Sequence, residues 1–365
     1  MNTALFFEPV DERFLKNSHT NSFAEAITVY HDLIPNWKNF DIALFTVGEV
    51  GDSFREKLYS LKKGNGIYKI VDLGILKAGE TNEDTQLRLS EVCKAMLEAS
   101  VIPFVIGENN SLALGQFGGF EGYEEPVSIS NVDALFDLEG EDEDAHYLQT
   151  LFGRGENLAH YAHLAHQSYL VNTQALTVFE KMNFEGIRLG EVRQNIEECE
   201  PVLRASNMLI FDVSAIKHRD FPANHHELPF GLSGEEACQL FWYAGLSNRL
   251  NSVGLYGFSL EKDQHGYSAM TLATMVWYFA EGYYARLDDM NFEGDGYFKY
   301  TISFDKAPHE LVFYKHRSSG KWWMLIDPEL KYNKRHVVPC SYIDYQLANT
   351  GELPDRWIRA SARIL

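Results

Sequence analysis

The sequence predicts an α/β protein with three α/β/α layers, in which helices cover both faces of a mainly parallel β-sheet. A small antiparallel β extension follows at the C-terminus. Short apolar runs alternate with helical patterns between residues 41 and 286. Each run is nearly continuous, which is typical of strands buried on both faces. The alternation of the two patterns is typical of a parallel sheet built from β–α–β units.

The large sheet is expected to contain several strands separated by helices. The predicted strands are the apolar runs at residues 41–47, 67–73, 101–106, 127–130, 208–213 and 253–258. Residues 86–100 carry apolar side chains at helical spacing, and a capping box opens another helix at Ser233. Residues 268–286 are apolar on nearly all sides, so we expect this helix to be buried on both sides.

The C-terminal region shows a different pattern. It predicts three antiparallel strands, at residues 297–304, 310–315 and 321–326. Trp322 and Trp323 should face opposite ways, so that one joins the core and the other covers a surface or a partner. The tail from Asn333 is expected to be irregular. The predicted division is an N-terminal extension (1–39), an α/β/α domain (40–293), and a C-terminal β-rich extension with a tail packed on the main domain (294–365).

Composition excludes several classes of function. The chain has 365 residues, 45% of them hydrophobic, and a net charge of −20. Such a charge repels nucleic acid and anionic membrane surfaces, so neither is expected as a partner, whereas a small-molecule ligand remains possible. The four cysteines are far apart in sequence, which suits a reducing compartment. We find no signal peptide, and the longest apolar stretch, residues 266–280, is shorter than the roughly 20 residues of a spanning helix. A cytoplasmic location is therefore expected.

Oxygen-rich residues follow three of the predicted strands. Glu108 to Ser111 come after one strand, Asp133 and Asp137 after the next, and Asp212 closes a third. Ligands of open α/β sheets bind just beyond the carboxyl ends of the strands. These residues are therefore the candidate site.

The three segments resemble the metal motifs of the ureohydrolase family, which comprises arginases, agmatinases and formimidoylglutamases. Those motifs read Gly-Gly-Asp-His-Ser, Asp-Ala-His-x-Asp and Ser-x-Asp-x-Asp. Residues 231–237 also resemble a Gly-Leu-Thr-x-x-Glu element that precedes a helix in the family. The resemblance covers about residues 40–290 and is nearest to the formimidoylglutamase-like branch. It implies an arginase-like α/β/α fold and a homo-oligomer.

The sequence departs from this family at the positions that carry its chemistry. Family members hold two Mn²⁺ ions through six side chains, and three of these are replaced here. Asn110 and Leu135 stand in place of histidines, and Ser214 stands in place of an aspartate. Gly257 stands where the family has the glutamate that holds the guanidinium or amidine group.

The resemblance implies that the losses fall mainly on one metal. Leu135 and Ser214 match ligands used only by the second ion, so we expect that site to be lost. The first site keeps oxygen at all four of its positions, Asn110, Asp133, Asp137 and Asp212. Such a set suits one Mn²⁺, Mg²⁺ or Ca²⁺ ion. The alternatives are no metal at all, or Lys217 or Arg219 turned inward as a counter-charge.

Two functions remain open at this point. We expect a pseudoenzyme of the ureohydrolase fold that binds a ligand or a partner. The alternative is an active C–N hydrolase of formimidoylglutamase type that uses a single metal, with Asp137, His218 and His225 as its catalytic candidates. A purely structural or interaction protein is the third possibility. We expect little or no amidine hydrolysis, because the bridging water of a two-metal site would be missing.

Two further patterns have residue types that could bind a metal ion. His160, His163 and His166 recur every third residue and would share a face of a helix, but the segment can equally be extended. We interpret these histidines as structural or surface residues. The acidic run from residue 139 to residue 144 is interpreted as a solvated loop, with a cation site as the alternative.

Overall fold

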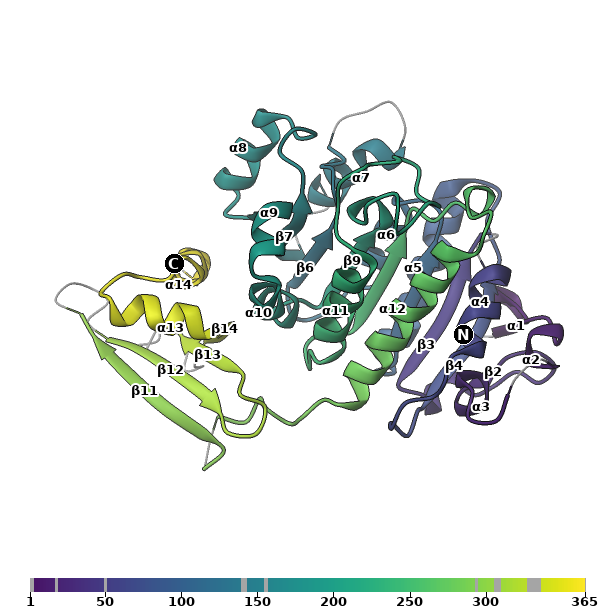
Figure 1. Cartoon of the computed structure of the whole chain (residues 1–365), viewed down its shortest axis with the longest axis horizontal. Helices are drawn as coiled ribbons and strands as arrows, with labels where there is room; N and C mark the ends of the chain where they lie inside the picture. The colour runs from purple at the N-terminus through teal and green to yellow at the C-terminus, as the bar shows by residue number, and fades with distance from the viewer. Residues whose placement is uncertain are drawn as a thin grey trace.

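The computed structural model describes residues 3–16, 19–48, 51–138, 143–153, 157–292, 295–304, 310–326 and 336–364. It contains one large mixed sheet with helices on both faces and a separate four-stranded sheet at the C-terminal end (Figure 1). The predicted α/β class and the antiparallel C-terminal extension are therefore confirmed. Within the described residues, no helix has both the length and the apolar character needed to cross a membrane.

The large sheet has ten strands in the order β1-β4-β3-β5-β10-β9-β6-β7-β8, with β2 also paired to β4. All pairs are parallel except β1 with β4. The strands are β1 (Phe7–Glu8), β2 (Thr28–Val29), β3 (Ile42–Val47), β4 (Ile70–Leu76), β5 (Ile102–Gly107), β6 (Val127–Val132), β7 (Leu158–His166), β8 (Glu185–Arg188), β9 (Met208–Asp212) and β10 (Ser252–Tyr256).

Each face of the sheet has its own core. The helices that pack into one core are α3 (Phe23–Ala26), α4 (Gly51–Ser60), α9 (Leu189–Gln194), α10 (Cys199–Arg204), α11 (Gly234–Gly245) and α12 (Tyr267–Tyr284). Those of the other core are α5 (Asn82–Glu98), α6 (Leu112–Gly118), α7 (Glu143–Gly153) and α8 (Thr173–Lys181). Figure 1 shows α11 and α12 in front of the sheet and α5 and α6 behind it. Two short helices, α1 (Thr3–Phe6) and α2 (Arg13–Lys16), lie near the N-terminus.

Helix starts follow local capping. The box predicted at Ser233 is present, because its hydroxyl accepts from the Glu236 N–H at 3.1 Å and the Glu236 carboxylate accepts from the Ser233 N–H at 2.7 Å. Helix α5 begins at residue 82, earlier than the predicted start at 86, because Thr81 caps it through Asp84. Asp84 takes the position at which a capping box usually has glutamate or glutamine, so the sequence pattern does not indicate this cap.

The C-terminal unit is a four-stranded antiparallel sheet with two helices. Its elements are β11 (Tyr297–Ser303), β12 (Glu310–His316), β13 (Trp322–Leu325), β14 (Val337–Cys340), α13 (Tyr342–Asn349) and α14 (Asp355–Ile364). The tail was expected to be irregular, and that expectation is wrong from residue 336 onward. Ser341 and Asp344 form a capping box for α13. Pro354 stands just before α14, where proline favours a helix start.

Both tryptophans of β13 are buried within the chain. Trp322 packs in the core beneath α13 and α14, and Trp323 packs on the opposite face with Phe292 and Tyr297. The expectation that one of them covers a surface or a partner is therefore wrong. The opposite face is closed by the linker residue Phe292 and by the Arg204 guanidinium, which lies 4.4 Å from the Trp323 ring centroid.

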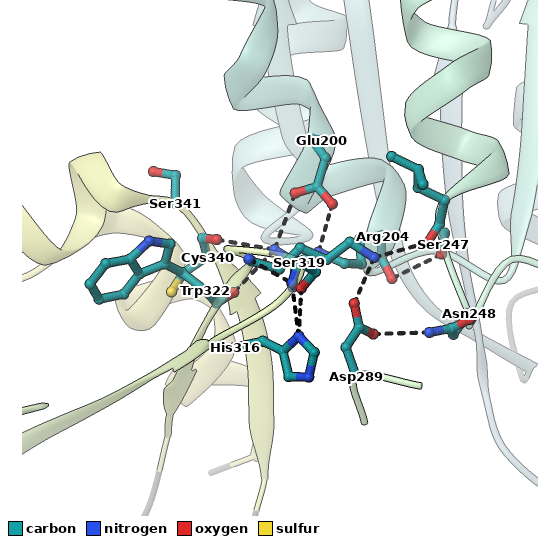
Figure 2. Close-up of polar contacts among 12 residues, drawn as sticks. Glu200, Arg204, Ser247, Asn248, Asp289, His316, Ser319, Trp322, Cys340 and Ser341 are labelled. Carbon is teal, nitrogen blue, oxygen red and sulfur yellow. Dashed lines mark hydrogen bonds and ion pairs between the residues drawn. The ribbon is translucent and has the colours of Figure 1, made fainter. Parts of the chain in front are cut away.

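Charged side chains join the C-terminal unit to the main domain. The buried Arg204, at the end of α10, donates to the carbonyls of Trp322 at 3.0 Å and Cys340 at 3.1 Å and pairs with Glu200 (Figure 2). The Lys321 ammonium lies 2.8 Å from the Asp289 carboxylate. Further along the interface, α14 contributes three arginines, which contact Glu198, Glu185 and His160. The unit is thus fixed by buried polar contacts.

Candidate functional site

The order of the strands brings the candidate residues together. Strands β5, β10, β9 and β6 are neighbours in the sheet, so their carboxyl ends meet at one edge. The segments that leave them carry Asn110, Gly257, Asp212 and Asp133, respectively. A cavity of about 450 Å³ opens there. Its lining residues are Glu108, Asn109, Asn110, Asp137, Glu143, Asp144, Ala145, Asp212, His225, His226 and Gly257.

Asp133 is fully buried and is not among the residues that line the cavity. One carboxylate oxygen, Oδ1, accepts from the Leu135 N–H at 3.0 Å and from the Ser214 hydroxyl at 2.7 Å. The other oxygen, Oδ2, has no hydrogen-bond partner among the described residues. Burial raises the pKa of Asp133 well above its usual value, and the nearby charges of Asp137 and Asp212 add to the effect.

Ser214 connects two of the candidate carboxylates. It lies in a short 3-10 helix, Val213–Ala215, directly after β9. Its hydroxyl donates to Asp133, and its backbone N–H donates to Asp212 Oδ1 at 2.5 Å. The serine therefore satisfies one oxygen of each aspartate without an ion.

Asn110, in the segment after β5, and Asp137, in the segment after β6, both line the cavity. The Asn110 amide donates to Asp137 Oδ2 at 3.4 Å, while its own carbonyl oxygen, Oδ1, has no partner within the described part of the chain. Burial and the charge of Asp212 raise the pKa of Asp137 to about 7. Burial also raises the pKa of Asp212, although the Ser214 hydrogen bonds, His226 and Asn110 oppose the shift. The pocket thus holds neighbouring buried carboxyl groups whose charge is relieved either by a proton or by a bound cation.

The three aspartates are not gathered as tightly as a complete ligand sphere. Among the described residues, one group of His, Cys, Asp or Glu side chains has its ligand atoms within 4.8 Å of each other. That group is Glu12, His31 and Asp32, which all precede the pocket-lining residues in the sequence. An ion bound to Asp133, Asp137 and Asp212 would have to draw these carboxylates closer together.

The loop between Asp133 and Asp137 rests on a buried hydrogen-bond network. His163 approaches the Asp133 carbonyl with Nε2 at 3.3 Å, and its Nδ1 lies 3.1 Å from the Tyr161 hydroxyl. Asn131 donates in turn to the hydroxyls of Tyr161 and Tyr147, each at 2.8 Å. Burial lowers the pKa of His163 well below its usual value, so the ring is neutral. It accepts from Tyr161 and donates to the loop.

The periodic histidines lie on strand β7, which is extended. His163 supports the candidate loop, and the His160 side chain contacts Glu185 and Arg363. His166 follows Ala165, whose φ of 70° breaks the strand register, and its ring centroid is 6.1 Å from that of His163. The interpretation of these residues as structural agrees with their contacts.

Gly257 touches the site directly. Its φ is +86°, and a Cβ at this position would lie 3.1 Å from both carboxylate oxygens of Asp212. Its N–H donates to the Glu108 carbonyl at 3.1 Å, which joins the ends of β10 and β5. The backbone shape at this position therefore accommodates glycine best.

The variant Gly257→Ala is expected to lower the free energy of unfolding by about 1–2 kcal/mol for the positive φ alone, and further through the contact with Asp212. Urea denaturation measures this loss. Gly122→Ala is the matched control, because Gly122 has a φ of +81° but nothing within 4 Å of the added Cβ. Equal losses for the two variants would contradict the proposed contact with Asp212.

The rim residues divide into those that reach the cavity and those that do not. His225 and His226 line it and are exposed. His218 is not among the lining residues; its N–H donates to the Leu228 carbonyl at 2.7 Å. Lys217 pairs with Asp220 at 3.1 Å, and Arg219 is exposed. Neither cation is part of the described cavity lining, so the expected inward counter-charge is not observed there.

Glu108 lines the cavity directly after β5, within the segment that the sequence indicates as part of the candidate site, although it was given no role there. Two further acidic residues of the cavity could not be assigned to the site from the sequence. Glu143 and Asp144 belong to the acidic run interpreted as a solvated loop, whose first four residues lie outside the described part of the chain. Distant residues hold both side chains, since Glu143 accepts from the amides of Asn82 and Gln86, and Asp144 accepts from the Ser111 N–H.

Comparison with known proteins agrees with this architecture. Residues 50–280 match the arginase family. Formiminoglutamase from Trypanosoma cruzi with Mn²⁺ superposes with a TM-score of 0.63 at 20% identity, over 70% of this chain and 97% of that chain. Formimidoylglutamase from Bacillus subtilis gives 0.63 at 13% identity, over 72% and 91%. Agmatine ureohydrolase from Thermoplasma volcanium gives 0.58 at 18%, over 75% and 99%. No curated protein matches the chain.

Proposed function

We propose, from the premise that the chain belongs to the arginase family, that it binds one divalent cation and a small ligand in this pocket without hydrolysing a C–N bond. The observation that carries the proposal is the position of Ser214. Its hydroxyl donates a hydrogen bond to Asp133 Oδ1, and its N–H donates one to Asp212 Oδ1. By resemblance to the family, the residue at this position would be the last ligand of a second ion. The serine hydrogen bonds therefore stabilise the two carboxylates in part, as that ion would.

The second ion of a ureohydrolase site has no fitting ligands here. Leu135 offers no ligand atom from its side chain, and its N–H already donates to Asp133. A bridging water between two metals is the usual source of hydroxide in such sites. Gly257 also removes the carboxylate that would orient an amidine. Both losses act against hydrolysis.

The oxygen atoms at the first of the two metal positions suit a single hard cation. Asn110 Oδ1 and Asp133 Oδ2 are buried oxygens without partners in the described part of the chain, and Asp137 and Asp212 add carboxylates. Mg²⁺, Ca²⁺ and Mn²⁺ take such oxygens. The ion would neutralise the buried carboxylates and attract electron-rich ligand atoms. Because the carboxylates must first move together, we expect weaker binding than at a preformed site.

A single-metal C–N hydrolase is the second candidate. The observation that favours it is the pair His225 and His226 at the cavity lining. An imidazole can carry a proton to or from a ligand near neutral pH. Asp137 would then be both a metal ligand and a neighbour of the reacting group, whereas His218 lies outside the cavity lining.

Metal stoichiometry tests the first part of the proposal. Native mass spectrometry after incubation with Mn²⁺ and desalting is expected to show one ion, and Asp137→Asn or Asp212→Asn should remove it. The variants are made in a His31→Ala background, so that the surface group with Glu12 and Asp32 does not contribute an ion. Two ions in the parent, or none, would contradict the proposal.

Activity separates the two candidates. Arginine, agmatine and N-formimidoyl-L-glutamate are incubated with the Mn²⁺-loaded protein, and release of urea or formamide is measured. We expect no release above the Asp137→Asn variant. Release that disappears in His225→Ala as well would establish the single-metal hydrolase instead.

A further inference from the structure

We propose that the free edge of β11 binds an extended segment of a partner protein in which acidic residues alternate with apolar ones. The inference goes beyond the proposed function, because β11 belongs to the C-terminal unit and contributes no residue to the pocket lining. Three observations carry it: an unpaired strand edge, an apolar row that is only partly covered there, and a local positive charge.

Strand β11 is the outermost strand of the four-stranded sheet (Figure 1). It pairs with β12 in one unbroken antiparallel register over seven residues, without a proline or a bulge. Proteins usually protect edge strands by such interruptions or by short length. The opposite edge is covered, since β14 packs beside α10 and the Cys340 carbonyl accepts from Arg204 at 3.1 Å. Within the described part of the chain, the edge at β11 is therefore the one open to a partner.

Half of the backbone groups of β11 point away from the sheet. In an antiparallel pair, every second residue exchanges hydrogen bonds with the neighbouring strand. The Arg317 N–H donates to the Gly296 carbonyl at 2.9 Å, and this pair sets the alternation along β11. No described backbone group bonds to the outward N–H and C=O groups, so an added strand can pair with them. The residues that carry these groups are Tyr297, Lys299, Thr301 and Ser303.

The apolar core beneath α13 and α14 reaches this edge and is incomplete there. Phe298, Tyr300 and Ile302 share one face of β11, because side chains alternate between the two faces of a strand. Tyr300 and Ile302 are partly buried against that core, whereas Phe298 is 44% exposed. Apolar side chains of an added strand would continue the same face and cover this row.

The C-terminal unit is positively charged although the chain is acidic. Residues 295–365 carry eleven lysines and arginines against eight aspartates and glutamates, in a chain with a net charge of −20. Lys299 is exposed on the edge strand itself, and the exposed Arg317 guanidinium lies 4.1 Å from the Phe298 ring centroid. Opposite charges across a strand pair are favourable. Acidic side chains opposite Lys299 would therefore complement this edge.

The same charge disfavours a second copy of β11 as the partner. The outward residues of one copy would have to pair with those of the other. In the longest antiparallel register, which is centred on Tyr300, the two copies of Lys299 become diagonal neighbours on one face. Like charges at this spacing repel each other. The partner that fits is thus a different, acidic segment.

Fluorescence anisotropy tests the inference with the full chain and a labelled heptapeptide in which glutamate and valine alternate, with glutamate at both ends. The parent chain is expected to bind this peptide. Thr301→Pro removes an outward N–H without breaking the ladder to β12, and it should weaken binding on the order of tenfold. Thr301→Val is the matched control, because it keeps the N–H and should bind as the parent does.

Lys299→Glu is a second variant, which keeps the test valid if Thr301→Pro does not fold. It should also weaken binding on the order of tenfold, since a repulsive cross-strand pair replaces an attractive one. Lys63→Glu makes the same charge change at an exposed position of the main domain and should leave the affinity unchanged.

Several results would overturn the inference. They are absence of binding by the parent chain, unchanged binding by a folded Thr301→Pro variant, and equal weakening by Lys63→Glu. Tighter binding of the matching peptide with lysine in place of glutamate would also do so. A dimer in sedimentation velocity that disappears in Thr301→Pro would assign this edge to a second copy of the chain instead.

Discussion

Replacement of Arg204 by leucine is expected to lower the free energy of unfolding by about 3–5 kcal/mol, the usual cost of removing one partner from a buried ion pair. The guanidinium is almost fully buried, pairs with Glu200 and donates to two carbonyls of the C-terminal unit (Figure 2). Leucine would leave the Trp322 and Cys340 carbonyls without this donor. It would also remove the cation that packs on the Trp323 ring.

The loss should appear first as separation of the C-terminal unit from the main domain. Tryptophan fluorescence in urea reports on it, because Trp322 and Trp323 both lie in the C-terminal unit, and limited proteolysis near residues 285–292 reports on exposure of the linker. Adding Glu200→Leu to the variant should recover part of the loss, since the unpaired carboxylate is then gone.

Arg188→Leu is the control for loss of an arginine. Arg188, the last residue of β8 and the residue before α9, also pairs with a nearby glutamate, Glu191, but it is 60% exposed. Such exposed pairs contribute little to stability, because water screens both charges. Similar effects of the two replacements would mean that Arg204 does not fix the C-terminal unit.

The α/β layers could be predicted because the pattern of apolar residues that indicates each strand or helix lies within that element. Strands such as β3 and β5 are buried along their whole length and almost entirely apolar, since both of their faces are covered by helices. Strand β7 could not be predicted in this way, because its histidines and alanines do not follow a clear strand or helix periodicity. It is a strand because it pairs with β6 on one side and β8 on the other. Its polar side chains are buried by contacts with distant residues, which the sequence does not reveal.

The candidate carboxylates could be predicted because they sit in short segments next to strand ends. Asp137 and Asp212 were assigned on that basis, and the structure places both at one cavity. Asp133 does not line this cavity, and it accepts hydrogen bonds from Ser214 and Leu135. The lining residues Glu143 and Asp144 could not be predicted, because their hydrogen-bond donors are up to 61 residues away in the chain. A charged run without those donors is usually solvated.

The double variant Leu135→His/Ser214→Asp is expected to raise the Mn²⁺ stoichiometry from one to two. It restores an imidazole and a carboxylate at the two positions that, by resemblance to the family, belong to the second ion. Ser214→Asp also removes the hydroxyl that now occupies Asp133 Oδ1. That oxygen would become free to bind an ion together with the new ligands.

Without metal the same variant should be less stable than the parent. A new carboxylate would join Asp133 and Asp212, both buried and both with raised pKa values, and the described cavity lining contains neither lysine nor arginine. Removing the hydroxyl donor and adding a like charge to a buried cluster costs several kcal/mol, about 3 or more. Mn²⁺ should reverse this loss, because binding to the folded state alone stabilises it.

Native mass spectrometry gives the stoichiometry, and thermal unfolding with and without Mn²⁺ gives the stabilisation. Leu135→Phe/Ser214→Asn is the matched control, since it changes size and polarity at the same positions without adding a strong ligand. Hydrolysis of agmatine should remain low even with two ions, because Gly257 still lacks the carboxylate that orients an amidine. A double variant that keeps one ion would show that the second site is closed by more than Leu135 and Ser214. Equal stabilisation of the control by Mn²⁺ would place the added ion outside the pocket.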